Sequence, residues 1–289
     1  MLMLTLWNKE LRTYFTSPIG YVFICFFLFM FGLYFMGINV LGQNGDYTYV
    51  LSSLTIFLFF ATPLLTMRLL SEEKRTRTDQ LLLTAPIKIQ GIILGKFLAA
   101  TTLLAITLIL TLIHPLLLAL TGTIPVLKIL SCYLGYWLLG STLIAIGLFI
   151  SALTENQIVA AISSIACFSF LLLADGMASL IPSTRSAALV FVLLLLILVT
   201  FIIHSATSSF LISGLTGSIG LLTLLGCYFI KGNLFEGLPT KIFKWFSVYQ
   251  RFDNFTNGLL DGGTIVYYLS FIGVFLFLTQ QAIEKHSWN

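Results

Sequence analysis

The chain has 289 residues, of which 58% are hydrophobic and only 9% are charged, and its mean hydropathy is +1.02. Soluble domains carry about 25% charged residues, so this composition excludes an ordinary soluble domain and predicts an all-α polytopic membrane protein. The net charge of +4 does not indicate a nucleic-acid partner, because the basic residues are spread over loops, where membrane topology explains them better.

The N-terminal residues 2–15 predict an amphipathic helix at the membrane surface. Leu4, Trp7, Leu11 and Tyr14 recur with helical spacing on one face, and such a helix lies in the plane of the interface. The alternative is an extended first span that begins outside the membrane. No cleavable signal peptide is expected, because the first apolar run is too long for a signal core.

Long uncharged runs follow along the chain, and a helix needs about 20 apolar residues to cross a bilayer core. The run 186–230 is too long for one span and breaks at the polar stretch 204–209, so it predicts two spans. The predicted total is about eight spans. They are 18–40, 47–67, 97–127 with a start near Gln90, 129–154, 156–174, 187–203, 210–230 and 264–283.

The distribution of lysine and arginine predicts the orientation of these spans. An even number of spans places both termini on one side, and loops on the cytoplasmic side carry an excess of basic residues. The loop 68–96 alone holds six of the 15 Lys and Arg residues. We therefore expect cytoplasmic termini, a cytoplasmic loop at 68–96 and an extracytoplasmic segment at 231–263.

The loop 68–96 is the strongest local signal for function, since it concentrates charge in an otherwise apolar chain. Residues 72–75 are Glu-Glu-Lys-Arg, and residues 78–84 predict a short amphipathic helix that ends at Pro86. A charged face with a ridge of leucines can insert into a groove on a partner protein. The alternative is a solvated loop whose charges only set the topology.

Motifs for chemistry on this chain are missing. The stretch 91–97 has three residues between its glycines where a Walker loop has four, and Phe97 stands where Ser or Thr must hold the metal. The three histidines lack ligand spacing, and the four separate cysteines predict no disulfide framework. We expect a non-enzyme with no catalytic residue, no metal site and no cofactor of its own.

The segment 231–263 mixes aromatic residues with charged ones. It is typical of short amphipathic helices that lie on, or dip into, the outer leaflet. Trp245, Phe246 and Tyr249 are our candidates for an outer gate. The alternative is an aromatic belt that only anchors the protein.

The loop 68–96, with its Glu-Glu-Lys-Arg run and the later Ala-Pro-Ile, resembles the coupling region of ABC type-2 permeases, the membrane subunits of ABC transporters. Stretches at 7–21, 153–160 and 252–277 are similar to the gliding-motility (Gld-type) subgroup. The resemblance implies an ABC type-2 exporter-like transmembrane domain over residues 1–289, located in the bacterial cytoplasmic (inner) membrane.

The resemblance also implies the partners of the chain. Cytosolic ABC ATPase subunits would bind ATP and Mg²⁺, a second permease copy or paralogue would complete a dimer, and an extracytoplasmic auxiliary protein is a further candidate. Rocking of the two permeases would then follow closure of the ATPases. The residues expected to couple to the ATPase are Glu72, Glu73, Arg75, Thr78, Asp79, Leu82 and Glu155.

The chain departs from the family pattern at two positions of the loop. The family usually has Gly where this chain has Arg77, and an acid where this chain has Gln80, with Asp79 displaced by one. The usual core has six spans, so we expect the pair across 186–230 to be an addition.

Other functions stay open at this point. One is an importer. Another is an extraction complex in which the permease transmits energy instead of transporting a substrate. Another is a non-transport membrane anchor or energy-coupling scaffold of an envelope or gliding complex. An ion-coupled carrier should have acids in the middle of its spans, and the apolar runs contain none except Asp175 at an edge.

Overall fold

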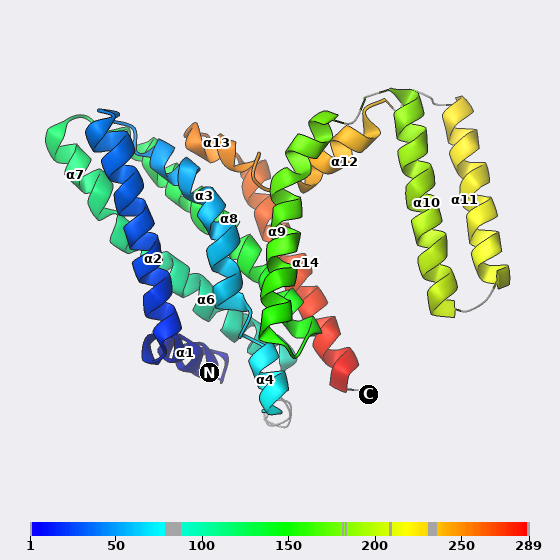
Figure 1. Ribbon diagram of the computed structural model, residues 1–289, viewed down its shortest axis with the longest axis horizontal. Helices are drawn as coiled ribbons and strands as arrows, with labels where there is room; N and C mark the ends of the chain where they lie inside the picture. Colours follow the sequence, from blue (N-terminus) through cyan, green and yellow to red (C-terminus); the bar gives the residue numbers. More distant parts are fainter. Residues whose placement is uncertain are drawn as a thin grey trace. The chain divides into compact units, whose positions relative to one another are not determined.

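The computed structural model of the protein describes residues 2–78, 88–180, 182, 184–207, 210–230 and 236–287. All regular elements in these ranges are helices (Figure 1), which confirms the predicted all-α fold class. The backbone forms two compact units: the first holds Met1–Phe170 and Val248–Asn289, and the second holds Leu171–Ser247. A single permease domain over the whole chain stays a prediction, since two packing units can belong to one membrane domain.

The helices of the two units are as follows. The first unit contains α1 (Leu2–Thr16), α2 (Pro18–Phe35), the π-helix η1 (Met36–Leu41), α3 (Thr48–Thr66), α4 (Ser71–Thr76), α6 (Ile89–Thr111), α7 (Ile113–Thr121), α8 (Val126–Leu153), α13 (Phe252–Thr256) and α14 (Gly262–Ser287). α9 (Gln157–Leu180) begins in the first unit and ends in the second, which also contains α10 (Arg185–Thr207), α11 (Phe210–Ile230) and α12 (Leu238–Phe246). Within the first unit, α1 and α4 lie at one end and α7 and α13 at the other (Figure 1).

Six segments of the described chain are long and apolar enough to span a membrane, so the protein is a multi-pass membrane protein. They are Pro18–Leu41, Thr48–Thr76, Ile89–Leu120, Val126–Leu153, Gln157–Ala174 and Gly262–Lys285. The shorter apolar stretches Arg185–Phe201 and Gly214–Leu224 lie in α10 and α11, on either side of the predicted polar break. The total of eight spans stays a prediction.

The N-terminal segment forms a helix of its own instead of extending the first span. Ser17 has an extended backbone, with φ −100° and ψ 154°, and Pro18 starts α2. The chain turns tightly here, because a Cβ on Gly20 would collide with the carbonyl of Tyr14. α1 is therefore a separate helix, and its location at the membrane surface stays a prediction.

The centre of the first unit is α8. In its most apolar stretch 78% is buried inside the protein, against at most 61% in the other five spans. Glycines allow neighbouring helices to approach its backbone closely. Added Cβ atoms on Gly140 and Gly147 would collide with Leu104 of α6 and with Thr66 of α3.

Helix α13 also packs against α8, and this differs from the prediction of surface helices at 231–263. Phe252 and Phe255 are fully buried, and the Phe252 ring meets Tyr136 of α8 edge-on at 6.2 Å. The residues just before α13 are also held against α14, because the hydroxyl of Tyr268 donates to the carbonyl of Val248 at 2.8 Å. Apolar burial against α8 and α14 therefore outweighs the amphipathic pattern, and this short helix belongs to the core.

The second unit is a helical hairpin with a short amphipathic helix. α10 and α11 pack through Gly217, whose added Cβ would lie 3.3 Å from Thr200, and through Gly220, whose Cβ would collide with Leu196. α12 is joined to α10 by Phe243, whose ring lies 5.8 Å from that of Phe191. The hairpin therefore has an internal contact surface of its own.

The contact between α8 and α13 gives a first prediction. Replacement of Gly135 by alanine should lower the free energy of unfolding by about 1–3 kcal/mol, because the new Cβ would lie 2.5 Å from Cγ of Phe255. The matched control is Gly32→Ala in α2, where a Cβ meets no atom within 4 Å. Thermal unfolding of the purified protein measures both, and equal melting temperatures would contradict the packing.

Candidate functional site

The charged run at 72–75 folds as the short helix α4, which follows α3 after a tight turn. Glu72 and Glu73 occupy its first turn, whereas Lys74 and Arg75 occupy its last turn. This order matches the helix dipole, which favours acids at the N-terminus and bases at the C-terminus. The sequence therefore favours a helix at this position, although six residues are too few to be stable without tertiary support.

The N-terminus of α4 receives that support from α8. The backbone amides of Leu70 and Ser71 donate to Oγ of Ser151, at 3.2 and 3.1 Å. Leu70 holds the N-cap position of α4 and makes no side-chain cap of its own. A serine from another helix therefore supplies the capping oxygen that the local sequence lacks.

The C-terminus of α4 ends in a left-handed residue. Arg77 has φ 55° and ψ 23°, and the amides of Arg77 and Thr78 donate to the carbonyls of Lys74 and Glu73, at 3.1 and 3.0 Å. This pattern of bonds is a Schellman motif. Arg77 is therefore the one residue of the turn that needs the left-handed conformation, which costs an L-residue with a side chain about 1–2 kcal/mol.

A second tie joins α4 to the end of α8. The ammonium of Lys74 donates to the carbonyl of Ala152, which lies in the last turn of α8. The last carbonyls of a helix lack partners within the helix, so this contact satisfies one of them with a positive charge. Both ends of α4 are thus fixed to the same end of α8.

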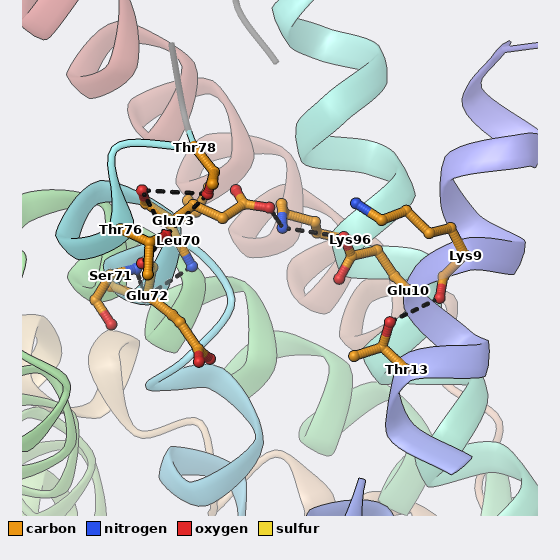
Figure 2. Close-up of polar contacts among 11 residues, drawn as sticks. Lys9, Glu10, Thr13, Leu70, Ser71, Glu72, Glu73, Thr76, Thr78 and Lys96 are labelled. Atoms are coloured by element: carbon orange, nitrogen blue, oxygen red, sulfur yellow. Dashed lines mark hydrogen bonds and ion pairs between the residues drawn. The ribbon is translucent and has the colours of Figure 1, made fainter. Parts of the chain in front are cut away.

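The inner face of α4 carries a buried ion pair. Nζ of Lys96, on α6, lies 2.6 Å from Oε1 of Glu73 and 3.3 Å from Oε1 of Glu10, on α1 (Figure 2). Only 2% of the Lys96 side chain is exposed, against 17% for Glu73 and 12% for Glu10. A buried charge is tolerated only when it is paired and hydrogen-bonded, so this lysine holds three helices together.

A more exposed ion pair lies nearby. Nε of Arg68 is 3.0 Å from Oε2 of Glu72, and both side chains are 38% exposed. Exposed pairs of this kind contribute only about 0–1 kcal/mol. The pair positions Glu72 but adds little to the stability of the site.

A cavity of about 490 Å³ lies beside these ion pairs. It is bounded by α1, by the end of α3, by α4 and by Lys96. Its charged lining residues are Lys9, Glu10, Arg68, Glu72, Glu73 and Lys96. Three positive and three negative groups therefore line one space.

The structure places the predicted coupling residues in two groups. Glu72 and Glu73 are partly buried and have internal ion-pair partners, whereas Arg75 and Thr78 are exposed. Glu155 is also exposed, in the short loop directly after α8, the helix end to which α4 is attached. Asp79 and Leu82 lie outside the described residues, as does the predicted helix at 78–84 beyond Thr78.

The predicted outer-gate residues are divided between the two units. Trp245 and Phe246 end α12 in the second unit, are 52% and 38% exposed, and have ring centroids 5.1 Å apart. Tyr249 lies in the first unit and is half-buried. The gate stays a prediction.

Sequence reasoning missed Ser151, Lys96 and Glu10. Their signal is weak, because Ser151 lies far along the chain from the helix that it caps and Glu10 belongs to an ordinary amphipathic pattern. Lys96 was the detectable one, since it is a charged residue inside the apolar helix α6. In the part of the chain that the structure describes, no three His, Cys, Asp or Glu side chains form a metal-binding group.

The left-handed turn gives a second prediction. The variant Arg77→Gly should stabilise the end of α4 by about 1 kcal/mol, because glycine adopts positive φ without strain. Arg75→Gly, two residues earlier in the regular helix, is the matched control and should destabilise α4 by about the same amount. Amide hydrogen exchange of residues 71–78 measures both, and slower exchange in neither variant, or in both, would contradict the assignment.

The cap from α8 gives a third prediction. Ser151→Ala leaves the amides of Leu70 and Ser71 without their acceptor and should cost about 1 kcal/mol. Ser141→Ala is the control, because this buried serine of the same helix donates only to the carbonyl of Trp137, four residues earlier, at 2.7 Å. If both variants exchange the amides of α4 at the same rate, Ser151 is not the cap.

The sequence model of a family described as ABC-2 family transporter protein matches residues 38–204, more than half of the chain. The matched region includes α4, Lys96, Ser151 and Glu155, whereas Glu10 precedes it. Among curated proteins, no sequence matches the chain.

Proposed function

The chain belongs to the ABC-2 family of transporter proteins and is a permease component of an ABC transporter, and from this premise we propose that α4 couples it to separate cytosolic ATPase subunits. Two copies of the chain, or this chain and a paralogue, form the translocation pathway of an exporter. The motifs at 7–21 and 153–160 favour the Gld-type subgroup. ATP and Mg²⁺ bind the partner, and an extracytoplasmic auxiliary protein is a further candidate partner.

The observation that carries this proposal is the contrast between the two sides of α4. One side is fixed by Ser151, Lys74 and Glu73 to α8 and α6, whereas Arg75, Thr76, Arg77 and Thr78 are exposed. A short helix held rigidly at both ends can transmit a push from a docked protein into the bundle. A solvated loop that only sets topology needs no such attachment.

The same attachment defines a small docking surface, which we name the α4 surface: Arg75, Thr78 and Glu155. All three residues are exposed. Arg75 lies on α4, Thr78 follows its C-terminal turn, and Glu155 lies in the loop after α8, the helix to which α4 is tied. Glu72 and Glu73 face internal partners and position this surface instead of forming its outer part. Asp79 and Leu82 remain candidates for the rest of it.

The proposed topology puts the α4 surface in the cytoplasm of a bacterium, with both termini on that side of the inner membrane. The excess of Lys and Arg in the loop 68–96 supports this orientation. So does the shared end of the first unit at which α1, α4 and the last turn of α14 lie (Figure 1). The predicted order of spans puts the segment 231–263, with Trp245, Phe246 and Tyr249, on the extracytoplasmic side, where a gate over the exit is expected.

An alternative function is a non-transport anchor or scaffold of an envelope or gliding complex. Such a protein needs no rigid helix between its membrane bundle and an ATPase. The tight fixing of α4 therefore favours the permease that is driven by ATP.

Docking at the α4 surface gives a fourth prediction. Arg75→Glu should lower the amount of ATPase that co-purifies with the permease about tenfold, the effect of about 1.4 kcal/mol, because it reverses a charge in the contact. The melting temperature of the permease should fall only slightly, because Arg75 is exposed and a charge at a helix end contributes about 0.3–1 kcal/mol. Quantitative co-purification from cells that express both proteins measures the effect.

Lys88→Glu is the matched control for this experiment. Lys88 is exposed and directly precedes α6, so it changes the charge of the same loop without touching α4. Equal recovery of the ATPase with both variants would contradict docking at the α4 surface. Purified permease that hydrolyses ATP without a partner would contradict the proposed function itself.

A further inference from the structure

The residue least explained by docking alone is Lys96. Among the buried residues of the described chain it is the only one with a charged side chain, and it lies on α6 instead of on α4. Long charged side chains are almost never fully buried unless they are paired. A partner ATPase cannot touch a side chain that is 2% exposed, so the role of Lys96 must be internal.

Lys96 has two carboxylate partners, and these come from different elements. Glu73 belongs to α4 and Glu10 belongs to α1, and Lys96 itself belongs to α6 (Figure 2). One cation is thus shared by two anions, so neither carboxylate can leave without altering the charge balance of the other. Breaking a buried pair by removing one partner is strongly unfavourable, because it leaves a charge uncompensated in a poorly solvated place.

The surroundings of Lys96 make α1 and α6 a close pair. Gly95 precedes the lysine, and an added Cβ there would lie 3.2 Å from Cδ2 of Leu6. Farther along, Nε1 of Trp7 donates to Oγ1 of Thr102 at 3.2 Å. α1 therefore lies directly on α6, and Lys96 emerges at the point where α4 reaches the same pair.

We propose that Lys96 is a positioning residue that ties the amphipathic helix α1 to α4, so that a displacement of α4 moves α1 with it. This inference rests on the proposed function, because it needs an ATPase that displaces α4. A movement of α4 displaces Lys96 through its 2.6 Å contact with Glu73, and Lys96 displaces α1 through its 3.3 Å contact with Glu10. The helix α1, which is predicted to lie at the membrane surface, then responds to the nucleotide state of the partner.

The fifth prediction separates the two contacts of Lys96. Glu10→Gln removes the charge on α1 and leaves the pair between Lys96 and Glu73 intact, so the ATPase should still dock. Hydrogen–deuterium exchange of the complex, compared with and without ATP and Mg²⁺, is the measurement. In the unaltered complex, exchange should change in both α1 and α4; in Glu10→Gln it should change in α4 only.

Two controls distinguish positioning from folding. Arg12→Gln removes a charge from an exposed position of α1 that does not line the cavity and should preserve the response of α1. The triple variant Glu10→Gln, Glu73→Gln and Lys96→Met removes the whole charged group, and replacement of a complete buried group is often tolerated. It should melt near the temperature of the unaltered protein and yet lose the response of α1.

The outcomes separate this inference from the proposed function. A nucleotide response of α1 that persists in Glu10→Gln would overturn the inference and leave docking at α4 untouched. Loss of the ATPase from Glu10→Gln would also overturn it, because Glu10 would then be part of the docking surface. Absence of any response of α4 in the unaltered complex would overturn the proposed function.

Discussion

A positive charge enclosed in a helical bundle determines how the functional end of this protein is built. Lys96 has almost no access to solvent, and its two anionic partners must therefore stay within contact distance. Hydrophobic contacts are non-directional and allow helices to slide, whereas an enclosed ion pair has a defined geometry. The position of α4 against α1 and α6 follows from that requirement.

The second determinant of the fold is helix α8, against which elements at both ends of the first unit pack. The C-terminal end of α8 fixes α4 through Ser151 and the Ala152 carbonyl. The N-terminal half of α8 contacts α13 at Gly135. Small residues on this helix let its neighbours pack against the backbone. A change at either end of the first unit therefore acts on the same rigid helix.

The structure also separates the charged residues of α4 that have internal partners from those that a partner protein could contact. The acids of the Glu-Glu-Lys-Arg run are the most conspicuous residues of the chain, but Glu72 and Glu73 are already paired with Arg68 and Lys96. Lys74 likewise reaches the Ala152 carbonyl of α8. Of the run, Arg75 is exposed, so much of the charge in α4 serves to attach the helix to its own bundle.

The amino-acid sequence by itself determined the class of the protein, most of its spans and the place of the charged cluster. Long apolar runs and the clustering of charge are local properties, and they predicted spanning segments such as 129–154, found at Val126–Leu153, and the charged cluster at 72–75. The sequence predicts the short helix at 78–84, whereas the structure forms α4 at Ser71–Thr76. Family resemblance pointed to position 77 as a glycine site, which the left-handed Arg77 explains. Only the tertiary structure decided that Glu73 meets Lys96 and Glu10, that Ser151 caps α4, and that Phe252 and Phe255 are buried. These contacts join residues far apart along the chain, and a local pattern carries no information on which distant side chain will satisfy a buried charge, a free amide or an aromatic face.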